Sequence, residues 1–407
     1  MTWQIASQAV LACNRSGVIK QVEHRIIQEV DGYLIRMFPS QVENDWREIK
    51  VTDMVIELAS SLALLVVFND GIGKDPRLLQ HLMSYSENLE GRVGTQMKYP
   101  FLLRPFVRRF SHSTRTLNSS IAALKGILVP EIRRRMEKID QKQTSTTAGS
   151  EIFYLDSMIH LAYKKNIINS YSGEKEKNKL ADLISEHTLM ICFEFSGPIW
   201  MFAAIMLFEV MLRPKYVTPL REELEAAVEL SKGEWSFDTF KHTPKLESFT
   251  RETLRVNPPS TLTSGRLVIE PLHLPSLGLT LEPGSKIALP SRWAMLDPDI
   301  YPDPHTFDGY RFIDPASGIC DIRDTTTPSK TWLPFAIGTL TCPGRLIGLR
   351  VCQTILSKML MDYDMELVNH DNHPLMLHGL GVAVPNPEIK MRVKSRHTGR
   401  EKVQSAS

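Results

Sequence analysis

The sequence has few cysteines, and none of them lies in a paired or metal-binding arrangement. The 407 residues include five, Cys13, Cys192, Cys320, Cys342 and Cys352, with no CxxC pair and no zinc-like cluster. An odd, widely spaced set gives no disulfide framework. We therefore expect the chain to occupy a reducing compartment.

A strong charge imbalance is also missing. The formal net charge is +2, and acidic and basic residues are interspersed. This balance gives no broad electrostatic footprint for nucleic acid or for an anionic membrane, so no nucleic-acid partner is expected. The run from Arg133 to Arg135 is interpreted as the solvated face of a helix.

Residues 1–19 do not resemble a targeting signal. Residues 1–19 lack the apolar run of roughly 7–15 residues of a signal peptide, or the ~20 of a membrane anchor. Residues 189–212 are apolar and long enough to span a bilayer, but they contain Glu194, Glu209 and the interruption Ser196-Gly197-Pro198. Because charges at membrane depth are costly, we interpret this stretch as a buried helix of a soluble domain. The chain is expected not to be secreted.

Helical periodicity dominates what is present. Apolar residues recur at intervals of three and four in several segments, which predict helices at 22–37, 54–68, 117–136, 220–230, 244–256 and 346–363. Two polar stretches, 141–150 and 170–179, predict surface loops. No repeat of 20–50 residues is visible, which excludes solenoids and propellers.

Strand-like sequence is confined to the second half. Residues 261–269 alternate as a strand, and 279–289 read as strand, Pro283-Gly284 turn, strand. Residues 365–367 and 388–393 are expected to be closing strands. Residues 296–315, dense in proline, aspartate and aromatics, predict an ordered meander. The fold class is therefore mainly α with small β-sheets (α+β).

The segment from Phe335 to Arg345 carries the candidate chemistry. It places Cys342 in a loop at the N-terminus of a helix, where amides and the helix macrodipole stabilise a thiolate. Gly338 and Gly344 allow the backbone to wrap closely around a ligand. The alternative is an ordinary buried cysteine, and spacing alone does not decide between the two.

The segment resembles the cysteine loop of cytochromes P450: Phe, two residues, Gly, three residues, Cys, one residue, Gly. Phe335, Gly338, Cys342 and Gly344 fill the four fixed places. The resemblance implies that Cys342 is the thiolate ligand of the iron in haem b (iron protoporphyrin IX), with the other three residues helping to bind the cofactor. Thiolate ligation favours cleavage of the O–O bond.

An upstream segment resembles the ExxR motif of the same family. Glu252 and Arg255 are three residues apart on one predicted helix face, and Asn257-Pro258-Pro259 follows. Tyr310-Arg311-Phe312 resembles the meander element that joins this pair. The resemblance thus implies a structural triad of Glu252, Arg255 and Arg311, and assigns Arg266 to a haem propionate.

The resemblance covers roughly residues 20–395 and is strongest after 185. In its wider sequence the chain is similar to fungal enzymes of secondary metabolism. It implies one cytochrome P450-like domain over 1–396, followed by a disordered tail at 397–407. About the first hundred residues of the usual family domain are expected to be missing from this chain, the membrane anchor among them.

The implied function is that of a haem-thiolate monooxygenase. Its substrate is expected to be a hydrophobic small molecule, with a terpenoid as the first candidate. Its electrons are expected to come from NADPH-cytochrome P450 reductase. The expected location is the cytoplasmic side of the cell, with association to the endoplasmic reticulum membrane left open.

Two places depart from the family pattern. Gly197 and Pro198 occupy the positions of the acid and threonine on the oxygen-binding helix, and proline has neither a side-chain proton nor a backbone N–H to donate. Leu340 stands where a histidine or arginine usually pairs with a propionate. Two alternatives therefore stay open: an isomerase or dehydratase that needs no oxygen activation, and a truncated, haem-poor pseudoenzyme.

Overall fold

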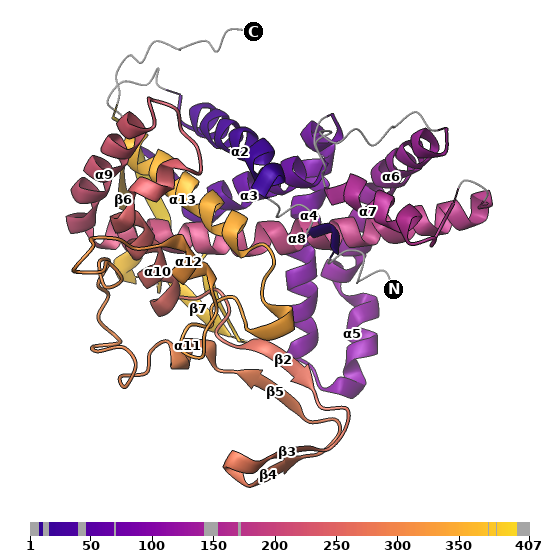
Figure 1. Cartoon of the computed structure of the whole chain (residues 1–407). Coiled ribbons are helices and arrows are strands. Elements are labelled where there is room, and N and C mark those ends of the chain that lie inside the picture. The colour runs from indigo at the N-terminus through magenta and orange to yellow at the C-terminus, as the bar shows by residue number, and fades with distance from the viewer. Residues whose placement is uncertain are drawn as a thin grey trace. The chain divides into compact units, whose positions relative to one another are not determined.

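The structure is a computed structural model that describes residues 8–10, 16–39, 46–68, 71–141, 154–169, 172–372, 374–379 and 381–396. The chain divides into two compact units. The first comprises Met1–Tyr33 and Met54–Trp200, and the second comprises Leu34–Asp53 and Met201–Ser407. The long helix α8 (Glu174–Leu212) begins in the first unit and ends in the second (Figure 1). The expectation of one domain over 1–396 stays a prediction, and the expected tail lies outside the described residues.

The described part of the first unit is helical. Besides the start of α8, it contains α2 (Ser16–Met37) up to Tyr33, α3 (Val51–Phe68) from Met54, η1 (Ile72–Lys74), α4 (Pro76–Met97), η2 (Phe101–Leu103), α5 (Arg104–Phe110), α6 (His112–Asp140) and α7 (Tyr154–Lys164). The helices predicted at 22–37, 54–68 and 117–136 are confirmed. Helices α4 and α7 were not predicted.

The core of the first unit follows from a four-residue repeat on α6. Leu124, Leu128, Ile132 and Met136 are all fully buried, and α6 packs against α4. Burying each such side chain stabilises the fold by roughly 1.5–3 kcal/mol. Two described helices, α3 and α8, are long and apolar enough to cross a membrane, and most of each apolar stretch is buried inside the protein.

The predicted loop at 170–179 is wrong beyond Gly173, because α8 begins at Glu174. The composition there is polar, but the polar side chains hold the helix end in place. Gly173 N–H donates to Glu176 Oε2 (3.2 Å), and the Lys177 ammonium lies 2.8 Å from an Asp140 carboxylate oxygen. Acidic residues in the first turn also suit the positive end of the helix dipole.

The interpretation of Arg133–Arg135 as a solvated face also needs correction. Only Arg134 is largely exposed, whereas Arg133 and Arg135 keep 12% and 14% of their side-chain surface. Arg133 pairs with Glu174 at 2.5 Å, and Arg135 pairs with Asp156 at 2.7 Å. The run therefore joins α6 to its neighbours.

The second unit combines helices with four small sheets. After the end of α8, its helices are η3 (Pro214–Tyr216), α9 (Val217–Leu230), η4 (Thr239–His242), α10 (Pro244–Val256), η5 (Pro275–Leu277), α11 (Ser291–Ala294), α12 (Ile322–Thr326), η6 (Gly338–Leu340), α13 (Arg345–Asp362) and η7 (His370–Asn372). The helices predicted at 220–230, 244–256 and 346–363 are confirmed as α9, α10 and α13. Residues 296–315 form the predicted meander without regular helix or strand.

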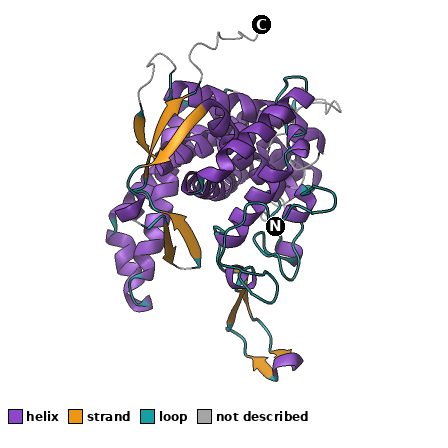
Figure 2. Ribbon diagram, turned by 90° about the vertical axis from the view of Figure 1, so that its left-hand side faces the viewer, coloured by secondary structure: helices purple, strands orange, loops and turns teal. Residues whose placement is uncertain are grey.

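The sheets are antiparallel and short, as the orange arrows of Figure 2 show. One sheet has the order β1-β9-β6, and the others pair β2 with β5, β3 with β4, and β7 with β8. Their bounds are β1 Arg47–Lys50, β2 Thr263–Leu267, β3 Leu272–Leu274, β4 Leu279–Leu281, β5 Lys286–Leu289, β6 Tyr363–Leu367, β7 Met376–Gly379, β8 Val382–Pro385 and β9 Lys390–Ser395.

The two strands predicted within 279–289 exist as β4 and β5, but they do not pair with each other. Leu281 of β4 lies opposite Leu272, and Leu289 of β5 lies opposite Thr263. The Pro283-Gly284 turn instead extends the pairing of β2 with β5, because Gly284 N–H donates to the Val268 carbonyl at 2.8 Å. The predicted mainly α fold with small sheets is confirmed.

Candidate functional site

The segment before α13 folds back on itself and presents Cys342. The Cys342 N–H donates to the Phe335 carbonyl at 2.9 Å, and the Thr341 N–H donates to the Gly338 carbonyl at 3.1 Å. Ala336 and Gly338 both have positive φ, 60° and 79°. This backbone suits glycine but costs an alanine about 1–2 kcal/mol, so the turn stands only because its surroundings hold it. We call residues 335–344 the cysteine loop.

Cys342 differs from the other described cysteines in exposure. Cys192, Cys320 and Cys352 are buried, whereas Cys342 is exposed. Burial raises the pKa of the Cys320 thiol to about 12 and raises the pKa values of Cys192 and Cys352 as well, so these three favour the neutral thiol. Of the described cysteines, Cys342 is therefore the one that a large external ligand can reach.

The glycines of the cysteine loop border open space. A Cβ built on Gly338 or Gly344 would meet nothing within 4 Å. Packing within the protein therefore does not require glycine at Gly344, and at Gly338 only the positive φ does. Room beside an exposed thiol at a helix N-terminus fits a flat cofactor that approaches the backbone closely.

Arg345 fixes the junction between the cysteine loop and α13. Its guanidinium donates from Nη1 to the Cys342 carbonyl (2.8 Å) and from Nε to the Thr326 carbonyl (2.6 Å). One side chain thus ties the carbonyl of the candidate ligand to Thr326, the last residue of α12. The position of Cys342 is held from its C-terminal side.

Strand β2 contacts the other end of the cysteine loop. Ile337 N–H donates to Ser264 Oγ at 3.3 Å. Arg266, two residues further along β2, is half-buried and donates from Nη1 to the Gly265 carbonyl at 2.8 Å. The structure therefore places the strand that carries Arg266 beside the cysteine loop.

The predicted triad comes together in the interior. Arg255 donates to both carboxylate oxygens of Glu252, at 2.8 Å and 2.9 Å, and both side chains are fully buried. The remaining Arg255 donor reaches the carbonyls of Met295 (2.9 Å) and Pro304 (2.8 Å). Such a pair is favourable only when every donor and acceptor is satisfied, and here the backbone of the meander completes it.

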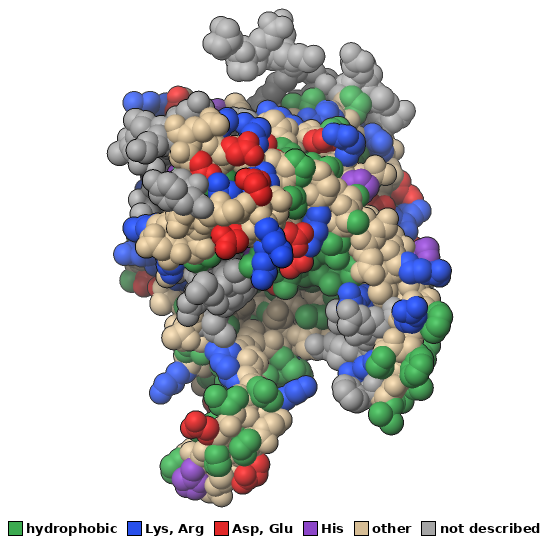
Figure 3. All heavy atoms as spheres, turned by 90° about the vertical axis from the view of Figure 1, so that its right-hand side faces the viewer, with side chains coloured by type: hydrophobic (Ala, Val, Ile, Leu, Met, Phe, Trp, Pro, Cys, Tyr) green, Lys and Arg blue, Asp and Glu red, His purple; other side chains and the backbone are tan. Residues whose placement is uncertain are grey.

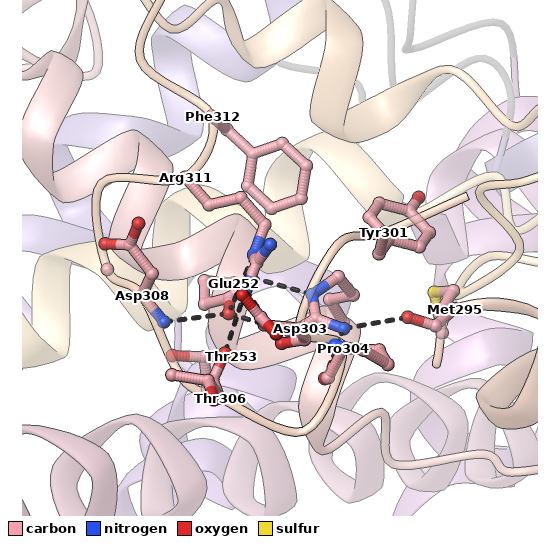
Figure 4. A network of polar contacts seen from close by, with 12 residues as sticks. Glu252, Thr253, Met295, Tyr301, Asp303, Pro304, Thr306, Asp308, Arg311 and Phe312 are labelled. Carbon is pink, nitrogen blue, oxygen red and sulfur yellow. Dashed lines mark hydrogen bonds and ion pairs between the residues drawn. The ribbon is translucent and has the colours of Figure 1, made fainter. Parts of the chain in front are cut away.

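Arg311 joins the same carboxylate from the meander, as Figure 4 shows. Its Nε lies 3.2 Å from each Glu252 oxygen, and its other nitrogens donate to three meander carbonyls, those of Pro302, Asp303 and Thr306. Asp308 N–H also donates to Glu252 at 3.0 Å. Glu252 thus organises a loop that has no regular secondary structure of its own.

A second buried ion pair was missed by the sequence reasoning. Arg350 of α13 donates to Glu247 of α10 at 3.2 Å, and both side chains are less than a tenth exposed. Gln353 bridges the two helices by donating to Glu247 (3.0 Å) and to Thr250 (3.2 Å). The only hint in the sequence is that charged residues fall on the apolar stripes of both helices.

The altered positions on α8 lie in the first unit. Gly197 is buried, Pro198 is exposed, and the helix continues through both. Pro198 has no N–H to donate to the Glu194 carbonyl four residues earlier, so that carbonyl is free of its helical partner. Desolvation raises the pKa of the Glu194 carboxyl, which lies on the same face of the helix as Pro198. The side chain of Leu340 lies outside the described residues.

Comparison with known proteins agrees with this geometry. The family model "Cytochrome P450" matches residues 2–393. The chain is 38% identical to "Cytochrome P450 monooxygenase cpsD" of Aspergillus campestris over 98% of this chain and 72% of that protein. It is 34% identical to "Bicoumarin synthase ktnC" of Aspergillus niger over 97% of this chain and 93% of that protein.

A solved structure shows the same fold. The retinoic acid-bound cyanobacterial CYP120A1 superposes with a TM-score of 0.69 at 16% identity, covering 95% of this chain and 78% of that one. The family and fold carry haem b, and the residues around the exposed Cys342 fit it. The relatives are fungal oxidoreductases of secondary metabolism, which makes this chain a haem-thiolate monooxygenase of that type. The chain belongs to the cytochrome P450 family.

Proposed function

We propose that Cys342 is the thiolate ligand of the haem iron, and that Phe335, Gly338, Gly344 and Arg266 would line the cofactor. The observation that carries this proposal is the exposure of Cys342 in a closed loop at the N-terminus of α13. When bound, haem supplies the activation of dioxygen, which thiolate ligation promotes.

In this proposal, the residues around Cys342 fix the position of the cysteine and do not themselves take part in the oxidation. Arg345 fixes the Cys342 carbonyl, and the Cys342 N–H is engaged by the Phe335 carbonyl. Arg266 supplies a guanidinium on the neighbouring strand, which suits a propionate carboxylate. A fixed ligand keeps the cofactor in one orientation.

The buried triad contributes through the aromatic side chains of the meander. Phe312 follows Arg311 and packs on Trp332, with ring centroids 6.0 Å apart. Trp332 Nε1 donates to the Thr325 carbonyl at 2.7 Å and lies three residues before Phe335. This route leads from Glu252 through Arg311, Phe312 and Trp332 to the chain segment that enters the cysteine loop.

The substrate is proposed to be a hydrophobic small molecule oxidised with electrons from NADPH-cytochrome P450 reductase. The sequence resemblance favours a terpenoid, whereas the name of the Aspergillus niger relative favours a coumarin. Titration of the purified haem protein with each class, followed by the change in the haem absorption spectrum, separates the two. If coumarins change the spectrum at lower concentrations than terpenoids do, a coumarin substrate is favoured. If terpenoids act at lower concentrations, a terpenoid substrate is favoured.

A second candidate function rests on Gly197 and Pro198. A helix that offers no acid or hydroxyl at Gly197 and Pro198 suits an isomerase or dehydratase, which needs no proton delivery to oxygen. Turnover of substrate without reductase and NADPH supports this function. A strict requirement for both supports the monooxygenase.

Membrane association is proposed to involve η2 and α5. Residues 91–130 contain no Asp or Glu but seven Lys and Arg, at 92, 98, 104, 108, 109, 115 and 125. Leu102, Phe106 and Phe110 are 81%, 65% and 70% exposed in the same segment. On the side of the molecule drawn in Figure 3, hydrophobic and basic side chains intermix at the lower right. Cationic and apolar groups together suit an anionic lipid surface.

The small net charge of the whole chain does not reveal this basic segment, because the acidic residues lie elsewhere in the sequence. Sedimentation with vesicles tests the assignment. Binding to vesicles that contain phosphatidylserine should exceed binding to pure phosphatidylcholine. The double variant Phe106→Ser and Phe110→Ser should reduce it at least severalfold, and unchanged binding would remove this segment from the interface.

A further inference from the structure

Strand β2 contains an irregularity next to the cysteine loop. Thr263 lies opposite Leu289 and Arg266 lies opposite Ile287, so β2 carries one residue more than β5 between these pairs. Ser264 sits in this bulge with a φ of 53°. A bulge turns a side chain out of the regular alternation of a strand, and such features recur beside functional sites.

The side chain of Ser264 makes a hydrogen bond at the strained part of the cysteine loop. Its Oγ accepts from Ile337 N–H at 3.3 Å, and Ile337 lies between Ala336 and Gly338, both with positive φ. The contact thus joins Ser264, which itself has a positive φ, to the residue that follows Ala336. Strain of this kind persists only where the surroundings over-determine it.

This contact complements the one made by Arg345. Arg345 holds the Cys342 carbonyl from the α13 side, while Ser264 holds the loop five residues before the cysteine. Between them, the Cys342 N–H closes on the Phe335 carbonyl at 2.9 Å. The orientation of Cys342 therefore depends on both ends of the loop.

We propose that Ser264 is a positioning residue for Cys342: its hydroxyl, turned outward by the β2 bulge, fixes the cysteine loop through Ile337 N–H. The proposal rests on the proposed role of Cys342 as haem ligand. Ser264 does not touch the reacting atoms, and its effect is on how firmly the thiolate is held.

Three substitutions separate the hydrogen bond from the backbone conformation. Glycine and asparagine both tolerate the positive φ of position 264, but only asparagine offers a side-chain acceptor. Ser264→Gly therefore removes the acceptor without adding strain, and Ser264→Asn restores an acceptor. Thr280→Ala, which removes a hydroxyl from β4 in the neighbouring two-stranded sheet, is the matched control.

The first readout is the stability of thiolate ligation in the haem-loaded protein. The rate at which the reduced carbon monoxide complex loses its thiolate-type band should rise about fivefold in Ser264→Gly, the factor expected for one lost hydrogen bond of about 1 kcal/mol. Ser264→Asn and Thr280→Ala should stay within about twofold of the wild type. Equal rates in all four proteins would overturn the proposal while leaving Cys342 as the ligand.

The second readout does not depend on haem. In haem-free protein, the rate of maleimide labelling at Cys342, assigned by peptide mass spectrometry, should change severalfold in Ser264→Gly and return towards wild type in Ser264→Asn. If wild type shows no thiolate band but labelling follows this order, the proposed function fails and the positioning by Ser264 stands. If labelling is the same in all four proteins, Ser264 does not position Cys342.

Discussion

Arg311 and Glu252 come from segments 59 residues apart, yet the Arg311 Nε lies 3.2 Å from both oxygens of the Glu252 carboxylate. Glu252 is fully buried and also accepts from Nε and Nη2 of Arg255. One carboxylate therefore compensates two guanidinium groups. Its removal would leave Arg255 charged and unpaired inside the protein.

Glu252→Ala is expected to lower the free energy of unfolding by about 3–5 kcal/mol, the cost of breaking a buried pair. The matched control is Glu366→Ala, which breaks the exposed pair with Arg392 on β9. That change should cost less than about 1 kcal/mol. Urea unfolding of both variants checks the difference, and similar losses in the two would contradict the importance of burial.

The pair of Arg350 and Glu247 predicts a non-additive response. Arg350→Leu alone leaves Glu247 buried without its cation and should cost about 3–5 kcal/mol. Adding Glu247→Gln neutralises that carboxylate, so the double variant should recover at least about 1 kcal/mol. A double variant less stable than Arg350→Leu would show that the two residues do not act as a pair.

The stability of the second unit should depend on pH through Glu223. Its carboxylate accepts from Lys245 N–H (2.7 Å) and Leu246 N–H (2.9 Å) at the start of α10, but desolvation by burial outweighs these bonds and raises the pKa of Glu223 to about 7. A raised pKa means that the folded protein binds the proton more tightly. The contribution is complete below about pH 4.5 and is lost as the pH rises towards 7.

Glu223→Gln should therefore flatten the pH dependence of unfolding between about pH 5 and 7, by about 1–3 kcal/mol over that interval. Glutamine keeps one acceptor for the α10 amides and cannot ionise. The exposed Glu225→Gln on the same helix is the control and should leave the profile unchanged. A wild-type stability that rises relative to that of Glu223→Gln over this interval would show that the pKa of Glu223 is lowered instead.

Pro198 and Pro130 should affect the stability of the protein alike, although only Pro198 should affect its function. Both prolines are exposed and lie inside long helices, α8 and α6, and each removes one helical hydrogen bond. Pro198→Ala and Pro130→Ala should each raise the free energy of unfolding by about 1 kcal/mol or more.

The function of the two prolines should be compared by introducing threonine at each place. Pro198→Thr supplies a hydroxyl on α8, the proposed oxygen-binding helix, and should increase the share of NADPH that ends in product rather than in peroxide. Pro130→Thr should leave that share unchanged. Equal shares in both variants would show that position 198 takes no part in proton delivery.

Local patterns predicted the parts of the site that depend on short spacing. Glu252 and Arg255 are one helical turn apart, and the residues of the cysteine loop are adjacent in sequence, so their arrangement follows from the segment itself. The contact of Ser264 with Ile337 depends on a bulge and joins residues 73 positions apart in the sequence. No propensity of serine indicates such a contact.

Burial likewise overrode composition in several places. Residues 174–179 are polar and were predicted as a loop, but Lys177 and Glu174 find partners on α6 and extend α8. Arg350 and Glu247 are 103 residues apart, and neither segment contains a pattern that predicts their pairing. The sequence indicates which residues are charged, and only the packed structure shows which charges are buried together.

The most direct test of the account is the reduced carbon monoxide difference spectrum of the purified, haem-loaded chain, with Cys342→Ala and Cys192→Ala measured alongside. Wild type and Cys192→Ala, which changes a buried cysteine, should show the thiolate-type band, and Cys342→Ala should lose it. A thiolate band that persists in Cys342→Ala, or no haem signal in folded wild-type protein, would contradict the assignment of Cys342 as the iron ligand.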